Sequence, residues 1–354
     1  MKKYFFLPSL VSLPLLFISC SKNSDTPAPV PTTSKTVYIA GMNKTSAGDY
    51  ETSLWKNGTK QVLLTNNSGA NAVYVSGTDV YVAGLIKSTT TNKYKAVVWK
   101  NGVAADLTDG TAPHAYASSV FVSGTDVYVA GVVQNVSLTN YATYWKNGSS
   151  VTLGLGSWAD DVQTINGIFA IGTDVYVAGT ARKSTGGYAI ALWKNGTITQ
   201  VSSGSSDFTC TGMFVSGTDV YISGYEDDGT NPTGPRLWKN GAPQTLNFTG
   251  GTAALANCVF VNGTDVYAGG FVVNASTGEW NARYWKNGTM ITLPDGPKSS
   301  RVNGIYVDGT DVYAVGFEEN ASRTKAAKLW KNGTASTLSD AGSVMAEGYS
   351  VFVK

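Results

Sequence analysis

Apolar and polar residues alternate in short segments of this chain, and the alternation predicts β-strands. The series Ser-Val-Val at positions 118, 120 and 122 alternates with Ser-Phe-Ser at 119, 121 and 123, a period of two that is typical of a strand. A returning strand is expected at 126–131. The intervening Gly124-Thr125 suits a two-residue type II′ turn, whose first residue needs a positive φ.

The same stretch continues with two further expected strands, at 141–145 and 151–155. Asn147-Gly148 lies between them, and this pair is the strongest short signal for a type I′ hairpin turn. One unit is therefore expected to contain four antiparallel strands, a to d, with two tight turns and two longer loops.

This unit recurs along most of the chain. Trp-Lys-Asn-Gly begins at residues 55, 99, 145, 193, 238, 285 and 330, at spacings of 44 to 48 residues. Gly-Thr-Asp-Val-Tyr keeps step with it, beginning at 77, 124, 172, 217, 263 and 309. Four strands in about 40–45 residues describe a propeller blade, so seven phrases predict seven blades.

The two ends of the repeat region predict that the ring closes. The first expected strand, 37–41, is a b strand without an a strand before it, and the last, 350–353, is an a strand without a b strand after it. Pairing them completes one blade and removes the open edge that a linear array would leave. We therefore expect an all-β, seven-bladed β-propeller of four-stranded antiparallel blades over 36–354, with an open β-solenoid as the alternative.

The first 35 residues indicate an envelope protein. Lys2 and Lys3 precede an apolar run over 7–18, so residues 1–19 are interpreted as a signal peptide. Phe-Ile-Ser-Cys at 17–20 resembles a bacterial lipobox, in which Cys20 would carry the lipid, palmitate included; an ordinary signal peptide or membrane anchor is the alternative. Residues 20–35, with three prolines, form a tether, and Ser21 favours the outer membrane, with the side it faces left open.

Charge argues against one class of partner. Charged residues make up 14% of the chain, well below the usual ~25%. Removing Lys2 and Lys3 leaves 24 basic residues against 24 acidic ones, so the mature net charge is about zero. Binding to nucleic acid needs a basic face, so no nucleic-acid partner is expected. Membrane contact is expected through the lipid anchor only, and the protein is expected to be a monomer.

The a–b unit at 119–131, Ser-Val-Phe-Val-Ser-Gly-Thr-Asp-Val-Tyr-Val-Ala-Gly, resembles the kelch blade. It departs in two ways: only Gly269-Gly270 ends a b strand in Gly-Gly, and the Trp closes strand c rather than lying near strand d. The chain as a whole also resembles the repeat-bearing lipoproteins of Bacteroidetes-type bacteria. These resemblances imply a fold and a location but no chemistry.

The repeated residues have structural interpretations. Seven Trp in seven blades favour packing between blades over a set of ligand platforms. The Asn-Gly pairs serve the turn, with a solvated Lys beside them, and the Asp of Gly-Thr-Asp is expected to accept backbone N–H groups, with a ring of cation-binding Asp as the alternative.

The variable loops are where a ligand site is expected. The a–b and c–d turns lie on one face of a propeller, and the b–c and d–a loops lie on the other, where length and sequence vary. Aromatic rings beside charged groups there would suit a sugar, and packing among loops is the alternative. The candidate ligand-binding residues are Trp158, Trp280, Asp160, Asp161, Tyr225, Asp227, Asp228 and Arg283. Tyr94, Tyr116, Tyr141, Tyr188, Tyr349 and Glu279 belong to the same loops.

Motifs for catalysis or cofactors are sparse. His114 is the one histidine and stands in a d–a loop without a motif around it, and no cofactor or metal is expected. Cys210 and Cys258 could be free thiols or a disulfide. A glycan hydrolase or lyase needs two carboxylates, and Asp160-Asp161, Glu226-Asp227-Asp228 and Glu318-Glu319 are the candidates.

We therefore expect a non-catalytic binding module for a glycan, a peptide or a partner envelope protein. A carboxylate-driven hydrolase or lyase and a structural component of an envelope assembly are the alternatives.

Overall fold

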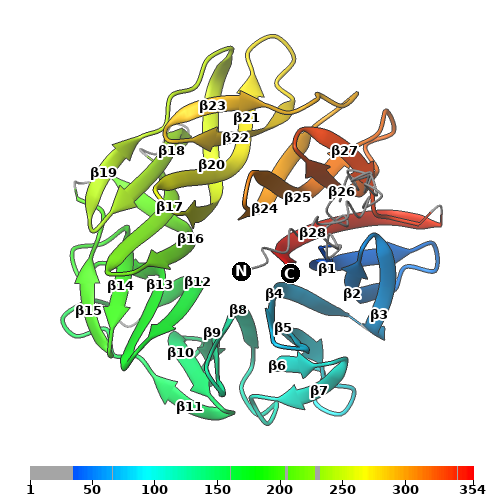
Figure 1. Cartoon of the computed structure of the whole chain (residues 1–354). Coiled ribbons are helices and arrows are strands. Elements are labelled where there is room, and N and C mark those ends of the chain that lie inside the picture. Colours follow the sequence, from blue (N-terminus) through cyan, green and yellow to red (C-terminus); the bar gives the residue numbers. More distant parts are fainter. Residues whose placement is uncertain (1–34, 66, 160, 204–205, 228–231, 341) are drawn as a thin grey trace, which may run out of the picture. The chain divides into compact units, whose positions relative to one another are not determined.

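The computed structural model describes residues 35–354 except 66, 160, 204–205, 228–231 and 341, and it describes residues 227, 232 and 233 by their backbone alone. The predicted signal peptide, Cys20 and nearly all of the tether lie outside the described residues. The described residues contain 28 strands and no helix. The strands form seven four-stranded antiparallel sheets arranged in a ring (Figure 1), which confirms the seven-bladed β-propeller.

Each blade takes four strands, from the channel outward. Blade 1 contains β28 (Ser343–Val353), β1 (Val37–Thr45), β2 (Tyr50–Lys56) and β3 (Thr59–Thr65). Blade 2 contains β4 (Ser68–Ser76), β5 (Asp79–Lys87), β6 (Tyr94–Lys100) and β7 (Val103–Asp106). Blade 3 contains β8 (Ala115–Ser123), β9 (Asp126–Gln134), β10 (Asn140–Lys146) and β11 (Ser149–Thr152). Blade 4 contains β12 (Val162–Ile171), β13 (Asp174–Arg182), β14 (Tyr188–Lys194) and β15 (Thr197–Gln200).

The remaining blades repeat this order. Blade 5 contains β16 (Asp207–Ser216), β17 (Asp219–Asp227), β18 (Pro232–Lys239) and β19 (Ala242–Thr245). Blade 6 contains β20 (Gly251–Asn262), β21 (Asp265–Asn274), β22 (Trp280–Lys286) and β23 (Thr289–Thr292). Blade 7 contains β24 (Ser300–Asp308), β25 (Asp311–Glu319), β26 (Lys325–Lys331) and β27 (Thr334–Thr337).

Blade 1 closes the ring, as the two ends of the repeat region predicted. Strand β28 pairs antiparallel with β1, with Val351 opposite Ile39 and Val353 opposite Val37. The backbone N–H of Thr36 donates to the carbonyl of Lys354 at 2.6 Å, which ties the two ends together. The last strand of the chain therefore supplies the innermost strand of the first blade.

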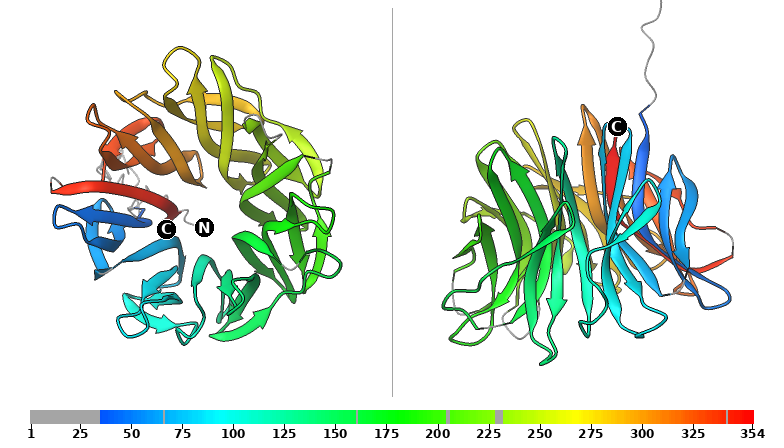
Figure 2. Two further views of the ribbon diagram at one scale, coloured as in Figure 1. Left: turned by 180° about the vertical axis from the view of Figure 1, so that it is seen from behind. Right: turned by 90° about the horizontal axis from the view of Figure 1, so that it is seen from below.

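The tight turns have the backbone geometry that their sequences predict. In all seven c–d turns the Asn has a φ of 50–52° and the following Gly a φ of 80–84°, as in type I′. In the six Gly-Thr turns only the Gly has a positive φ, between 55° and 61°, as in type II′. These turns define the turn face, and the b–c and d–a loops define the opposite loop face (Figure 2).

On the turn face, the two repeated phrases join into one polar cluster. In blade 3, Asn147 Oδ1 accepts the backbone N–H of Val127 at 2.8 Å, and Asn147 Nδ2 donates to Asp126 at 2.8 Å. Lys146 lies 2.7 Å from the same carboxylate and above the ring of Tyr128. The expectation that the Asp accepts backbone N–H groups is wrong, because the Asn side chain accepts the backbone donor and the Asp binds the Asn and the Lys. The Lys146 side chain is 47% exposed and so is solvated, as expected.

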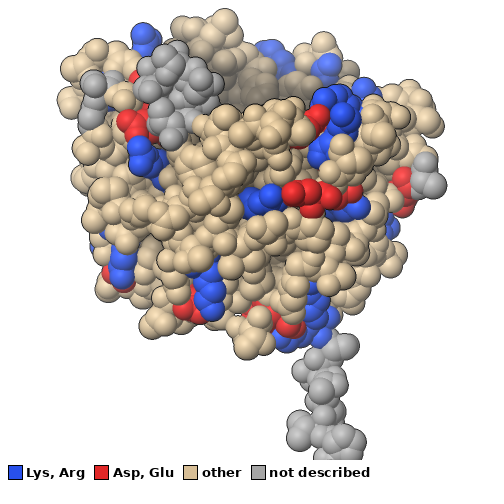
Figure 3. All heavy atoms as spheres, turned by 90° about the horizontal axis from the view of Figure 1, so that it is seen from above, with Lys and Arg blue, Asp and Glu red and all other residues tan. Residues whose placement is uncertain are grey.

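Six blades carry this cluster, and blade 1 has Thr36 where the others have Asp. Acidic and basic side chains also mostly adjoin one another on the largely uncharged surface in Figure 3. The Asp–Lys pairs of the cluster are Asp79–Lys100, Asp126–Lys146, Asp174–Lys194, Asp219–Lys239, Asp265–Lys286 and Asp311–Lys331.

These pairs predict a loss of stability in acid. Hydrogen bonds from Lys146 and then Asn147 hold the pKa of Asp126 below its usual 3.8, and the equivalent five Asp shift the same way. A carboxylate whose pKa is lower in the native state stabilises it fully above the unfolded pKa, and this contribution disappears as pH falls through the native pKa. We expect the melting temperature to hold from pH 7 to about 5 and to fall below about pH 4.

Circular dichroism melting curves between pH 7 and pH 2 measure this effect. The variant carrying Asp126→Asn, Asp174→Asn and Asp219→Asn should lose less stability in acid than the natural chain. Equal losses in the two proteins would show that these pairs do not carry the acid dependence.

The seven repeated Trp pack between blades, as predicted. Each is at most 4% exposed. Three of the indole N–H groups donate to a carbonyl just after the d strand of the preceding blade: Trp55 to Leu338, Trp193 to Gly154 and Trp285 to Asn247, at 2.6–2.9 Å. The buried indoles therefore pack between blades rather than offering a ring face to a ligand, and three of them add a hydrogen bond to the neighbouring blade.

A closed ring of aromatic side chains surrounds the channel near the turn face. One comes from the first strand of each blade, and neighbouring ring centroids lie 4.6–5.2 Å apart. Tilted and edge-to-face contacts at this separation are favourable. We call the set the aromatic collar: Tyr74, Phe121, Phe169, Phe214, Phe260, Tyr306 and Phe352.

Each first strand carries a β-bulge three residues before its collar aromatic. In blade 3, Ala117 pairs with Gly131 and Ser119 with Ala130, so Ser118 is the extra residue. All seven blades repeat this register shift. A bulge redirects a side chain, and here it fixes the wall of the channel. The bulge residues are Asn71, Ser118, Asn166, Thr211, Asn257, Asn303 and Tyr349.

Candidate binding cavity

The channel widens into a cavity between the aromatic collar and the loop face. Its volume is about 750 Å³, and all seven blades contribute to its wall. Ligand pockets of small molecules usually measure about 300–1,000 Å³. Apolar residues next to the collar, such as Val259, Ile305 and Val351, line its deep end, and the bulge residues line its middle.

The bulge residues form a polar belt that also fastens the blades together. Four of them donate a hydrogen bond to the backbone of the next blade, to a carbonyl beside that blade's own bulge. Asn71 donates to Ala117, Thr211 to Ala256, Asn257 to Val302 and Asn303 to Gly348, at 2.7–2.9 Å. The amide oxygen of Asn166, in contrast, is buried without a partner among the described residues. The belt therefore uses several of its polar groups to hold neighbouring blades together.

Three tyrosines add hydroxyl groups to the cavity wall, Tyr349 within the polar belt and the other two nearer the loop face. Tyr116, Tyr225 and Tyr349 line the cavity, and their hydroxyls make no hydrogen bond to another described residue. Burial raises the pKa of Tyr116 to about 12 and that of Tyr349 further, so both remain O–H donors at neutral pH. Of the candidate ligand-binding residues whose side chains the structure describes, Tyr225 is the one that lines this cavity.

His114 also lines the cavity, and its side chain makes no hydrogen bond to another described residue. Its ring centroid is 5.2 Å from that of Tyr94 and 5.7 Å from that of Tyr116. Burial lowers the pKa of His114, so the imidazole is neutral at pH 7. Its stacking position makes it part of the aromatic wall.

Arg301 is the one charged side chain among the described residues that line the cavity. Its guanidinium lies 5.2 Å from the ring centroid of Phe317 and 5.9 Å from that of Trp280. Nη2 donates to Glu347 at 3.3 Å, and Nε is buried without a partner. Sequence reasoning missed Arg301 because it lies inside a strand rather than in a loop.

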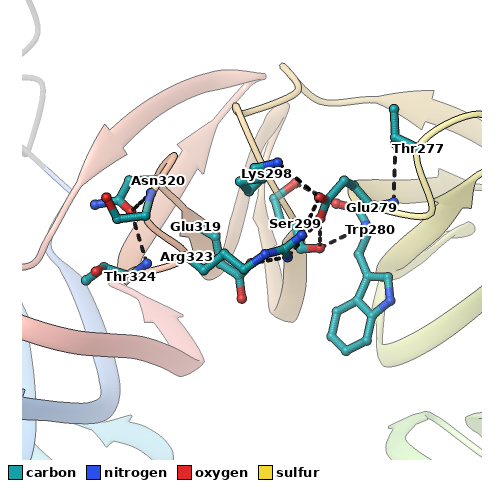
Figure 4. Close-up of polar contacts among 11 residues, drawn as sticks. Thr277, Glu279, Trp280, Lys298, Ser299, Glu319, Asn320, Arg323 and Thr324 are labelled. Carbon is teal, nitrogen blue, oxygen red and sulfur yellow. Dashed lines mark hydrogen bonds and ion pairs between the residues drawn. The ribbon is translucent and has the colours of Figure 1, made fainter.

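Trp280 is half-buried, and its ring is not bare. It stacks on Phe271 with centroids 4.7 Å apart and an interplanar angle of 23°. Figure 4 shows the indole pointing away from the neighbouring Glu279. That carboxylate accepts from Ser299 at 2.7 Å and pairs with Arg323 at 2.8 Å. Trp280 therefore contacts the guanidinium of Arg301 but does not itself line the cavity.

Trp158 and Arg283 also lie away from the cavity. Trp158 packs against the hydrophobic core between blades 3 and 4. The Arg283 side chain is buried, with Nη1 2.6 Å from Asp295 and donating to the carbonyl of Ala282 at 2.8 Å. These contacts of Arg283 hold strand β22 to the loop that follows β23.

The acidic candidates do not converge on the cavity among the described residues. Asp161 lies in the loop before β12, where its carbonyl accepts the backbone N–H of Arg182 at 3.0 Å. Asp160, Asp228 and the side chain of Asp227 lie outside the described residues. Glu318 pairs with Lys328 at 3.2 Å, and Glu319 with Arg323 at 3.4 Å. The described part of the chain thus shows no carboxylate pair at the cavity.

The two cysteines that the structure describes, Cys210 and Cys258, are free thiols. Both line the cavity, Cys210 one residue before the bulge in blade 5 and Cys258 one residue after it in blade 6. Burial raises the pKa of each to about 12, so both stay protonated. Across the described ranges, no three His, Cys, Asp or Glu side chains group into a metal site, and no helix has the length and apolar character to cross a membrane.

Comparison with known proteins supports the fold. No protein-family model matches the chain, and no curated protein matches it. The β-propeller domain of the Trilobed protease from Pyrococcus furiosus is similar, with 12% identity over 86% of this chain and 92% of that one, at a TM-score of 0.50.

Two peptidases are also similar in structure. The puromycin-hydrolyzing peptidase of Mycobacterium tuberculosis has 10% identity over 88% of this chain and 52% of that one, at a TM-score of 0.57. The uncomplexed acylaminoacyl peptidase of Pyrococcus horikoshii has 12% identity over 87% and 51%, at 0.52. The chain spans about half the length of each peptidase. At sequence identities this low, the structural similarity shows a shared fold and nothing further.

Proposed function

We propose that this protein is an envelope-anchored, kelch-like lipoprotein whose propeller binds a glycan in its central cavity without catalysing a reaction. The observation that carries the proposal is the combination of a polar belt with the three tyrosine hydroxyls that lack protein partners. Sugars present many hydroxyls at fixed spacing and apolar ring faces, and this wall offers amide, hydroxyl and aromatic groups in the same space.

The position of the first strand fits this proposal. Strand β1 begins on the turn face, so the described chain enters the propeller at the end opposite its loop face. The cavity opens toward that loop face, where a ligand can approach.

A glycan array screened with the full-length protein in detergent tests the proposal. We expect binding, and we expect Tyr116→Phe with Tyr225→Phe to weaken it about tenfold, since a hydrogen bond is worth about 0.5–1.5 kcal/mol. Tyr141→Phe with Tyr188→Phe is the matched control, because those two tyrosines lie outside the cavity. Palmitate labelling of the same preparation should disappear in Cys20→Ala.

A blank array would contradict glycan binding and favour a protein partner. Equal losses in the two double variants would move the site away from the cavity. Retained labelling in Cys20→Ala would contradict the lipid anchor alone.

A further inference from the structure

The wall of the cavity is asymmetric in charge, which bears on the kind of glycan it takes. Two residues before the bulge, the seven first strands carry Gly69, Tyr116, Thr164, Thr209, Leu255, Arg301 and Glu347. Glu347 is 4% exposed and does not line the cavity, whereas Arg301 does. A positive charge therefore faces the cavity, and no described acidic side chain does.

The charge of Arg301 is only partly compensated. Its contact with Glu347 is 3.3 Å long, whereas Lys325 lies 2.6 Å from the same carboxylate. One carboxylate thus serves two cations, and the group of Arg301, Lys325 and Glu347 carries a net charge of +1. A partly buried excess charge is poorly screened and attracts an anion.

Neighbouring side chains hold the guanidinium of Arg301 in place and leave several of its N–H groups without an acceptor in the described chain. Phe317 and Trp280 flank it, and Glu347 takes one of its five N–H groups. Its buried Nε–H has no partner among the described residues. The N–H groups of Nη1 make no hydrogen bond to a described residue and are not buried, so the outer end of the guanidinium can bind a carboxylate. Tyr349, from the neighbouring blade 1, adds a free hydroxyl to the same wall.

We propose that the cavity selects glycans that carry a carboxylate, such as uronic acid units, with Arg301 binding the carboxylate and Tyr349 donating a further hydrogen bond to it. This inference rests on the proposed function and specifies its ligand. The sugar ring then lies along the polar belt, where amide and hydroxyl groups meet its own hydroxyls.

Calorimetric titration with galacturonic acid oligomers and with neutral galactose oligomers of equal length tests the inference. We expect the acidic oligomers to bind at least about tenfold tighter, as a charge-assisted pair requires. Arg301→Gln should remove most of this preference. Arg323→Gln is the matched control, because it removes the same charge from an exposed residue of blade 7 outside the cavity.

The outcomes separate the inference from the proposed function. Equal affinity for acidic and neutral oligomers would overturn the carboxylate inference and leave glycan binding intact. Binding of neither would overturn both. A preference that survives Arg301→Gln in a variant that melts like the natural protein would overturn the role of Arg301. If Arg301→Gln melts at a lower temperature, Arg301→Lys replaces it in the test. Arg301→Lys keeps the charge but not the planar guanidinium, so it should retain only part of the preference for acidic oligomers.

Discussion

Deleting residues 350–354 should remove most of the cooperative stability of the propeller. Val351 and Val353 are 7% and 3% exposed, and they pair with Ile39 and Val37 across the closure of the ring. Phe352 completes the aromatic collar, with centroids 4.9 Å from Tyr74 and 5.0 Å from Tyr306. Burying each such side chain is worth about 1.5–3 kcal/mol, so the loss approaches the ~5–15 kcal/mol that stabilises a whole domain.

Urea unfolding followed by tryptophan fluorescence measures this loss, because seven indoles report on the blade interfaces. We expect a broad transition at low urea in the truncated protein. Two single substitutions on β28 serve as controls. Val351→Ala should cost about 1–3 kcal/mol, and Val344→Ala, at a residue 45% exposed, should cost little. A sharp transition at the natural midpoint after truncation would contradict closure by β28.

The number of blades could be predicted because the turn signals are local. A type I′ turn needs two consecutive positive φ values, and Asn-Gly meets this need without help from the rest of the fold. The partners of the Asp and Lys on the turn face were not predictable in the same way. Asp126 and Lys146 are 20 positions apart in sequence and meet only because β9 and β10 pair in register.

The candidate site shows the same limit. The sequence makes Arg283 a candidate because it follows Glu279 and Trp280. In the structure, however, the alternation of side chains along β22 directs Arg283 toward Asp295. Arg301 comes beside Trp280 from the next blade, a proximity that only the packing of blades creates. The collar, in contrast, has a sequence signal that is easily overlooked: six aromatic residues, each at the same offset before an a–b turn, and Phe352 at the matching place in the last strand.

Replacing Gly131 by Ala should destabilise the protein although the position needs no positive φ. Gly131 stands opposite the bulge in blade 3, and a Cβ there would lie 1.9 Å from the carbonyl oxygen of Tyr116 and 2.9 Å from Cα of Ala117. Both atoms are backbone, so relief requires the bulge to move. All seven blades have a Gly at this place, with the corresponding carbonyl oxygen 1.8–2.3 Å away. Forced overpacking costs about 1–3 kcal/mol, and a clash with backbone lies at the upper end.

Gly154→Ala is the matched control, because an added Cβ there meets nothing within 4 Å. Urea midpoints should fall for Gly131→Ala and stay near the natural value for Gly154→Ala. Equal urea midpoints would mean that the bulge can move to accept the Cβ at little cost in the free energy of unfolding. The Gly131→Ala change should also alter the cavity wall. The carbonyl that must move belongs to Tyr116, and the bulge places Ser118 in that wall. If the bulge sets the position of the wall, Gly131→Ala should weaken glycan binding even under conditions where the variant is fully folded, whereas Gly154→Ala should leave it unchanged.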